Sequence, residues 1–411
     1  MEDKNFLKQV VSHPSRWRTI LSAFILIVMT VAVTLLVDNH FEKQERGSPE
    51  TVHLGAWGEL KELDLRMEQP EEYVGFEKVS GEGPLWTFGT LSEPAIHDLL
   101  KASGLGEDQI GTLIATRIPG TGNIVILKPD ETLITSLDPE VRSKLYLQLA
   151  SNTANRFQAT PYYIPGGDVT SIFQGHRNIS VQTRQSVEHL IYKRNGFTYF
   201  SDPEVVLKHV ESDDERSDFL KAMTGQKVVK LKLMIRPDTD INKSLNYWTL
   251  AIPHILVKDV RPLFESLGRL NFGGDLSIEY ILPPLARDHL FITPAMTSEG
   301  EVKLPDCHWS ALNFFNLKPD PRMSDNDFAA DYITRNYYEI GKPSIEGDLV
   351  LLINAQNRVL HSSVYLADNI VFTKNGINFA QPWVTMRIND MVGYFSALEP
   401  VRIAYFRRKD L

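Results

Sequence analysis

The sequence has a single cysteine, Cys307, in 411 residues. It therefore cannot form a disulfide within the chain, and it cannot supply the thiolates of a structural zinc site. Exported domains of this size often carry disulfides. One cysteine in such a domain is either a small buried hydrophobic residue or a thiol kept for its reactivity, and the count alone favours the first.

Several motifs of common sites are also missing. The chain contains no H-E-x-x-H and no G-x-S-x-G, which excludes the usual zinc peptidase and serine hydrolase patterns. Gly120-Thr-Gly122 precedes a predicted strand and therefore indicates a turn, not a phosphate loop. Residues 238–249 begin like a calcium loop, but Lys243 and Thr249 stand at the required glycine and glutamate positions. The 11 histidines show no metal-ligand spacing. We expect no metal and no cofactor.

An excess of positive charge is absent as well. The formal net charge is −9, whereas phosphate binding needs a concentrated surface of Lys and Arg. The lysines between Lys227 and Lys232 alternate with Val and Leu, which is typical of one solvated face of a strand. We expect no nucleic-acid partner.

One long apolar run is present, the 19 uncharged residues from Thr19 to Val37. As a helix this run is about 28 Å long, close to the hydrocarbon thickness of a bilayer. A signal peptide usually has a shorter apolar region followed by a small-residue cleavage site, and a core helix usually has a polar stripe. The run therefore predicts a single transmembrane anchor.

The flanking charges predict the orientation of this anchor. Lys4, Lys8, Arg16 and Arg18 precede the run, whereas only Lys43 and Arg46 follow it closely. An excess of Lys and Arg marks the cytoplasmic side. We therefore expect a single-pass protein of the inner membrane, with its N-terminus in the cytoplasm and the bulk of the chain outside it.

The rest of the composition, 43% hydrophobic and 10% aromatic, is that of a globular protein with room for two or more cores. Helical and extended patterns alternate, which predicts an α+β fold. We expect a cytoplasmic segment, the anchor, a polar linker, a mixed α/β region of unknown role and a C-terminal domain. The corresponding ranges are 1–18, 19–37, 38–55, 56–295 and 296–411.

Local patterns predict the elements of the last part of the chain. Asp306 is a favoured N-cap, so a helix is expected to begin at Cys307. Strands are expected at 347–353, 360–366 and 370–373, with a turn at 367–369. The C-terminal domain is thus predicted to be one helix followed by a meander of strands.

Cys307 and His361 form a candidate catalytic pair. A thiol in the first turn of a helix has a lowered pKa, because the helix dipole and free N–H groups favour the thiolate. His361 is a polar residue on a predicted apolar strand and is a candidate base. Thr373, on the next strand, is the first candidate to orient the imidazole, ahead of Lys374 and Asn375. Here the context of Cys307 favours a reactive thiol over a buried one.

Three segments in this order resemble the NlpC-type papain-like cysteine peptidases and amidases of bacterial cell walls. They are Asp306-Cys307, Gly347-Asp-Leu-Val350 and His361-Ser-Ser-Val-Tyr-Leu366. The resemblance covers roughly residues 300–400, and it implies a papain-like domain with Cys307 as nucleophile, His361 as base and Thr373 at the third position. His308-Trp309 and Thr373 depart from the family pattern. A longer stretch, including residues 282–287, is similar to exported bacterial proteins whose activity is not established.

The resemblance implies a membrane-anchored thiol hydrolase of the bacterial cell envelope, a peptidase or amidase acting on peptidoglycan peptides. The alternative is a non-catalytic envelope protein that uses the same fold to bind a glycan, a peptide or another protein. The substituted third position and the large extra region, 56–295, are compatible with that alternative.

Overall fold

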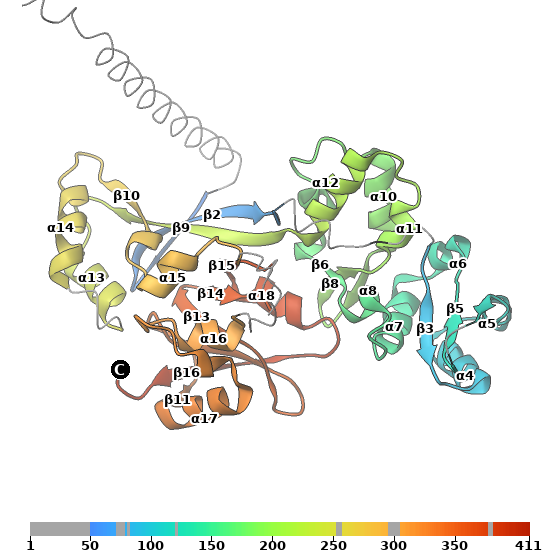
Figure 1. Ribbon diagram of the computed structural model, residues 1–411. Coiled ribbons are helices and arrows are strands. Elements are labelled where there is room, and N and C mark those ends of the chain that lie inside the picture. Colours follow the sequence, from blue (N-terminus) through green and yellow to red (C-terminus); the bar gives the residue numbers. More distant parts are fainter. Residues whose placement is uncertain are drawn as a thin grey trace, which may run out of the picture. The chain divides into compact units, whose positions relative to one another are not determined.

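The computed structural model describes residues 50–70, 79, 83–119, 122–251, 257–294, 305–376 and 381–411. These residues form a mixed α/β structure with four sheets, and every pairing whose register is defined is antiparallel (Figure 1). The expected mixture of helices and strands is thereby confirmed. The predicted anchor, 19–37, lies outside the described residues. Within the described ranges, none of the helices combines the length and apolar character that a bilayer crossing needs.

Strands and helices are mixed along the whole described chain. The strands are β1 (Glu50–Gly55), β2 (Gly58–Met67), β3 (Trp86–Gly89), β4 (Arg117–Ile118), β5 (Val125–Leu127), β6 (Tyr162–Ile164), β7 (Tyr192–Arg194), β8 (Phe197–Phe200), β9 (Gln226–Ile235), β10 (Gly274–Ser277), β11 (Tyr337–Ile340), β12 (Leu349–Ile353), β13 (Val359–Ala367), β14 (Ile370–Lys374), β15 (Trp383–Arg387) and β16 (Arg402–Arg408). The α-helices are α4 (Glu93–Ser103), α5 (Glu107–Ile114), α6 (Glu131–Ser136), α7 (Pro139–Leu149), α8 (Arg156–Ala159), α9 (Val169–Ile172), α10 (Val181–Leu190), α11 (Pro203–Leu207), α12 (Asp213–Thr224), α13 (Ile241–Thr249), α14 (Val257–Gly268), α15 (Pro284–His289), α16 (Cys307–Leu312), α17 (Asn326–Asn336) and α18 (Ile388–Phe395). Short 3₁₀ turns lie at Pro165–Gly167, Ile278–Tyr280 and Pro321–Ser324.

A four-stranded sheet has the order β1-β2-β9-β10. Along β9 the lysines are partly exposed and most of the apolar residues are buried, as the alternation in the sequence predicts. β1 corrects the expectation that residues 38–55 are all linker, since Glu50–Gly55 form a strand. Val52 and Leu54 are exposed. This strand is therefore held by backbone pairing with β2, and not by burial of these apolar side chains. Composition alone does not reveal such pairing.

Two large apolar cores lie in the compact unit Val52–Leu411. The first is built from residues between Trp86 and Met223, together with Ala397. The second joins β2 and β9 to the C-terminal elements, for example Leu233 with Phe372. This second core thus contains residues from both of the predicted regions, 56–295 and 296–411.

The C-terminal sheet has the order β11-β16-β12-β13-β14-β15. The expected meander is present from β12 to β15, but the prediction of one helix followed only by strands was wrong. α17 and β11 precede the meander, α18 interrupts it after β15, and β16 inserts between β11 and β12. Pairing of β16 with distant strands leaves no local trace in the sequence.

The two faces of this sheet are covered by different helices. α16 packs against β13 and β14, on the face that contributes Leu351 and Phe372 to the second core. The opposite face contributes Leu352 and Val371 to a third, smaller core, which also contains Met391 of α18. Cys307 belongs to α16 on one side of the sheet, whereas His361 pairs with Leu352 on the α18 side.

Candidate functional site

Cys307 opens α16 as the sequence predicts. The Asp306 carboxylate accepts a hydrogen bond of 2.7 Å from the backbone N–H of Trp309, which is the N-cap arrangement. The thiol is buried, with 7% of the residue exposed. The backbone N–H of Ser362, on β13, donates to it. The helix start therefore places the sulfur beside the backbone of the residue that follows His361.

His361 and Thr373 are brought together by the β13–β14 pair. The imidazole Nε2 and the Thr373 hydroxyl Oγ1 are 2.6 Å apart, and both residues are fully buried. Thr373 Oγ1 in turn lies 3.4 Å from Asn375 Oδ1. A hydroxyl that donates to Asn375 accepts from His361 Nε2–H, which leaves a lone pair on Nδ1. The contact expected between Thr373 and the imidazole is present.

No hydrogen bond joins the members of the candidate pair, Cys307 and His361, in the described residues. His361 Nδ1 is buried and has no hydrogen-bond partner among the described residues. Side chains alternate along β13. Ser362 points toward α16, where its hydroxyl contacts His308 Nδ1 at 2.8 Å. His361 points toward α18, where its ring stacks on Phe395 with centroids 4.1 Å apart.

Burial keeps both groups of the pair neutral. It raises the pKa of the Cys307 thiol to about 11, although the backbone N–H groups of Ser362 and His308 act in the opposite direction. It also lowers the pKa of His361 to about 3, with a smaller contribution from His308. A thiolate–imidazolium pair needs the opposite shifts. The site described here therefore holds a thiol and a neutral imidazole.

Lys374 is the cation that faces the thiol. Burial lowers its pKa to about 8, and Cys307 and Asp306 oppose that shift. Its Nζ donates to the Gly376 carbonyl at 2.7 Å and lies 5.5 Å from the centre of the Trp383 ring. Lys374 thus interacts with the nucleophile candidate instead of orienting the imidazole.

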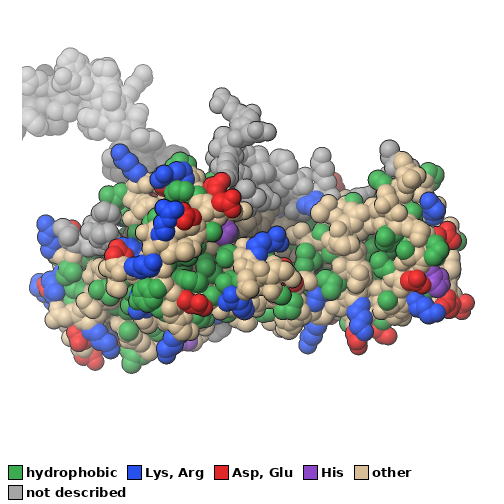
Figure 2. All heavy atoms as spheres, turned by 90° about the horizontal axis from the view of Figure 1, so that it is seen from below, with side chains coloured by type: hydrophobic (Ala, Val, Ile, Leu, Met, Phe, Trp, Pro, Cys, Tyr) green, Lys and Arg blue, Asp and Glu red, His purple; other side chains and the backbone are tan. Residues whose placement is uncertain are grey.

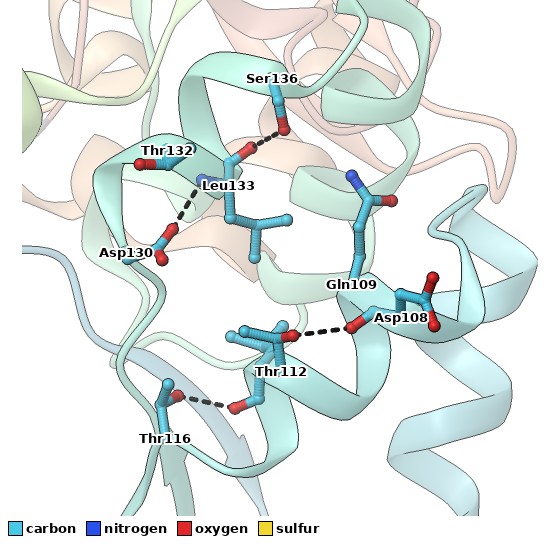
Figure 3. A pocket seen from close by; sticks show the side chains of 9 residues that line it. Asp108, Gln109, Thr112, Thr116, Asp130, Thr132, Leu133 and Ser136 are labelled. Atoms are coloured by element: carbon cyan, nitrogen blue, oxygen red, sulfur yellow. Dashed lines mark hydrogen bonds between the residues drawn. The ribbon is translucent and has the colours of Figure 1, made fainter.

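Two pockets of the described structure lie away from Cys307 and His361. One, of about 260 Å³, lies between α5 and α6 and is lined by hydroxyl and carboxyl side chains (Figure 3). The hydrogen bonds drawn there join Thr112, Thr116, Asp130 and Ser136 to backbone atoms of nearby residues. These groups stabilise the local chain, and the groove does not bring a nucleophile and a base together.

The larger pocket, of about 680 Å³, lies on the α18 face of the C-terminal sheet. Its lining includes Trp57, Tyr365 and Val392, but not Cys307 or His361. Another lining residue, Ile403, pairs with Leu352, and Leu352 pairs with His361 across the next strand. Leu352 therefore lies between the pocket and the imidazole on the same face of the sheet.

Charged side chains of both signs are interspersed over the face of the molecule drawn in Figure 2. Hydrophobic side chains lie between them on the same face. On that face the described residues do not form an extended area of one sign.

Comparison with known proteins found no matching family model and no matching curated protein or solved structure. The resemblance to NlpC-type enzymes therefore rests on the motif residues around Cys307 and His361.

Three residues of this region were not singled out by the sequence. Ser362 contacts the thiol through its backbone, and strand alternation next to His361 is the signal that would have placed its side chain toward the helix. Phe395 covers the imidazole from α18, and the sequence carries no signal for this contact. Trp383 lies under Lys374 because β14 and β15 pair there.

Proposed function

We propose that the protein is a membrane-anchored extracytoplasmic thiol hydrolase, with an NlpC-type papain-like C-terminal domain, that cleaves cell-wall peptides. Cys307 is the nucleophile, His361 the base and Thr373 the group that orients the imidazole. The anchor at 19–37 holds the enzyme in the inner membrane beside its peptidoglycan substrate. The proposal joins the anchor and motif of the sequence to the local geometry at α16 and β13.

The observation that carries this proposal is the state of the His361 ring. Thr373 holds Nε2, while Nδ1 is fully buried and makes no hydrogen bond with any described residue. Leaving a buried polar atom unpaired costs about 1–3 kcal/mol. An unpaired lone pair on Nδ1 is what a general base needs in order to accept a proton, and this supports His361 in that role.

In the described state His361 and the Cys307 thiol face opposite sides of β13, so the proposed reaction requires a rearrangement that brings Nδ1 to the sulfur. Nδ1 of His361 takes the proton of the Cys307 thiol, and the sulfur attacks the carbonyl carbon of the substrate amide. The imidazolium then protonates the leaving amine as the C–N bond breaks, which leaves an acyl group on the sulfur. Water, deprotonated by the same imidazole, releases the acid and restores the thiol.

The described state is a closed form of this site. Phe395 covers the imidazole and burial opposes charge on both groups. Movement of Phe395 away from the ring would admit water and substrate. Solvation of the site then brings both pKa values toward their ordinary ranges and favours proton transfer.

A non-catalytic envelope protein is the second candidate. It is favoured by the raised pKa of Cys307 and by the larger pocket, whose lining does not reach the thiol. In that case the aromatic lining of the pocket, with Trp57 and Tyr365, binds the ligand.

The test compares full-length wild type with Cys307→Ala and Cys307→Ser on purified peptidoglycan, with release of peptides followed by mass spectrometry. The hydrolase proposal expects release by wild type and none by either variant. Lys318→Ala is a suitable control, because Lys318 lies on the exposed surface just after α16 and is not part of the reaction. Equal release by wild type and Cys307→Ser would remove the hydrolase proposal, since an alcohol does not replace a thiolate beside an imidazole at neutral pH.

A further inference from the structure

Three potential metal ligands meet where the β1–β2 hairpin approaches the turn between β13 and β14. They are His53 on β1, Glu62 on β2 and Asp368 in the turn, and one ligand atom from each lies within 4.8 Å of the others. His53 Nδ1 is 3.4 Å from Asp368 Oδ2, and His53 Nε2 is 3.8 Å from Glu62 Oε1. These residues are remote in sequence from the Cys307 motif and take no part in the proposed hydrolysis.

Glu62 is the unusual member of this cluster. Its side chain is only 1% exposed. Arg387 Nη2 donates to Oε2 at 2.7 Å, whereas Oε1 has no hydrogen-bond partner among the described residues. A buried carboxylate oxygen without a partner is costly. Here that oxygen is directed at His53, where a bound cation would satisfy it.

The surrounding charges leave room for a cation. Arg387 is shared between Glu62 and Asp64, with an Nη1–Oδ1 distance of 2.5 Å to the latter. Lys227 Nζ lies 3.8 Å from Asp64 and 3.6 Å from Asp390. The two cations Arg387 and Lys227 are therefore shared among Glu62, Asp64 and Asp390, and neither of them pairs with Asp368. Arg387 acts as an outer partner that fixes the Glu62 carboxylate, a common arrangement around metal ligands.

We propose that His53, Glu62 and Asp368 bind one divalent transition-metal ion of the Zn²⁺ type. One imidazole nitrogen and two carboxylate oxygens form a three-ligand set with an open fourth position for water. A tetrahedral ion at about 2.0–2.2 Å from each ligand brings the ligand atoms to roughly 3.3–3.6 Å from one another. His53 and Asp368 are partly exposed, so small rotations bring their atoms together around Glu62.

The position of the cluster indicates what the ion does. Asp368 also lines the 680 Å³ pocket on the α18 face of the C-terminal sheet. An ion held there joins the β1–β2 hairpin to the β13–β14 turn. Its open coordination position lies at the border of the pocket, where an oxygen atom of a ligand can displace the bound water.

The test is binding of Zn²⁺ alone to the full-length protein, carrying no polyhistidine tag and stripped with a chelator, by isothermal titration calorimetry. We expect saturable binding of one ion per chain and a rise of several degrees in Tm when the ion is in excess. Co²⁺ in place of Zn²⁺ should give visible absorption bands of a low-coordinate site. His53→Ala and Asp368→Asn should each weaken the binding by at least about tenfold.

Asp368→Asn removes the carboxylate but is compatible with the native backbone, so a loss of binding in this variant is not due to misfolding. Asp368 has a backbone φ of 51°, a conformation that Asn adopts readily. His97→Ala is the matched control, because His97 also lies beside a glutamate and an aspartate, Glu107 and Asp98, but on an exposed surface. The absence of saturable binding would overturn the proposal and leave His53 as a plain ion-pair partner of two carboxylates. Binding of equal strength in the His53 variant would overturn it too.

Discussion

The imidazole of His361 lies nearly parallel to the ring of Phe395, with a centroid distance of 4.1 Å and an angle of 23° between the planes. His361 comes from β13 and Phe395 from the end of α18. This contact closes the α18 side of the candidate site. Burial of the imidazole, to which this contact contributes, lowers the pKa of His361 to about 3.

Replacing Phe395 by Ala should uncover the imidazole. The pKa of His361 then rises toward its ordinary value. If His361 takes the thiol proton as the hydrolase proposal requires, alkylation of Cys307 by iodoacetamide at pH 7 should become several-fold faster. The lost packing of this half-buried ring should lower the free energy of unfolding by roughly 1–2 kcal/mol. The measurement is the labelling rate at pH 7. Val392→Ala, on the same helix, is the control, and an unchanged rate in Phe395→Ala would show that the ring does not gate the thiol.

Acid should destabilise the fold through His361. The unfolded chain protonates this histidine near pH 6.5, whereas the folded protein does so near pH 3. Between these values the unfolded state binds more protons, so the free energy of unfolding falls as pH falls, by up to about 1.4 kcal/mol per pH unit. His361→Gln should therefore flatten the dependence between pH 6.5 and 3. Urea unfolding at several pH values measures it.

His189→Gln provides the comparison for this experiment, because His189 is exposed and its ring contacts a backbone carbonyl, that of Thr135, and not a carboxylate. Its pH dependence should follow that of wild type. Buried carboxyl groups such as Asp202 contribute a slope of the opposite sign, so only the difference between curves is informative. Parallel curves for wild type and His361→Gln would contradict the burial of a neutral imidazole.

Thr373 should matter for both stability and activity. Thr373→Ala removes the partner of the buried His361 Nε2, which should lower the free energy of unfolding by about 1–3 kcal/mol. It should also reduce peptide release moderately, because the imidazole loses its fixed orientation. Thr373→Ser keeps the hydroxyl and should retain most of the activity. An equal loss of stability and activity in both variants would indicate that the packing of the Thr373 methyl group, and not the hydrogen bond to His361, is responsible.

The proposed topology rests on the charges around residues 19–37. A phosphatase that is active only outside the cytoplasm, fused after Leu411, should be active, and the mature protein should keep its native N-terminus. Activity of a cytoplasm-dependent reporter at the same position would place the chain on the other side of the membrane. Replacing Lys4, Lys8, Arg16 and Arg18 with neutral residues removes the positive charges before the anchor. This should weaken the preference for a cytoplasmic N-terminus.

Much of the local structure could be predicted from short-range patterns. Ser92 caps the start of α4, and Gly104 ends it in the left-handed region at φ 107°. Asp306 caps the helix that begins at Cys307, as predicted. The predicted strand at 370–373 is β14, at Ile370–Lys374. Capping, turn chemistry and alternation are set by residues a few positions apart, so they are visible in the sequence.

The sequence by itself also determined which residues carry the candidate chemistry, because a cysteine after a helix cap and a polar residue in an apolar strand are local anomalies. Only the tertiary structure decided what surrounds them. α18 brings Phe395 onto His361, β14 brings Lys374 to the thiol, and the β1–β2 hairpin brings His53 and Glu62 toward Asp368. These contacts join segments up to about 300 residues apart, and their burial sets the pKa values. Local propensity contains no information about such pairings, since they arise from the packing of whole sheets and helices.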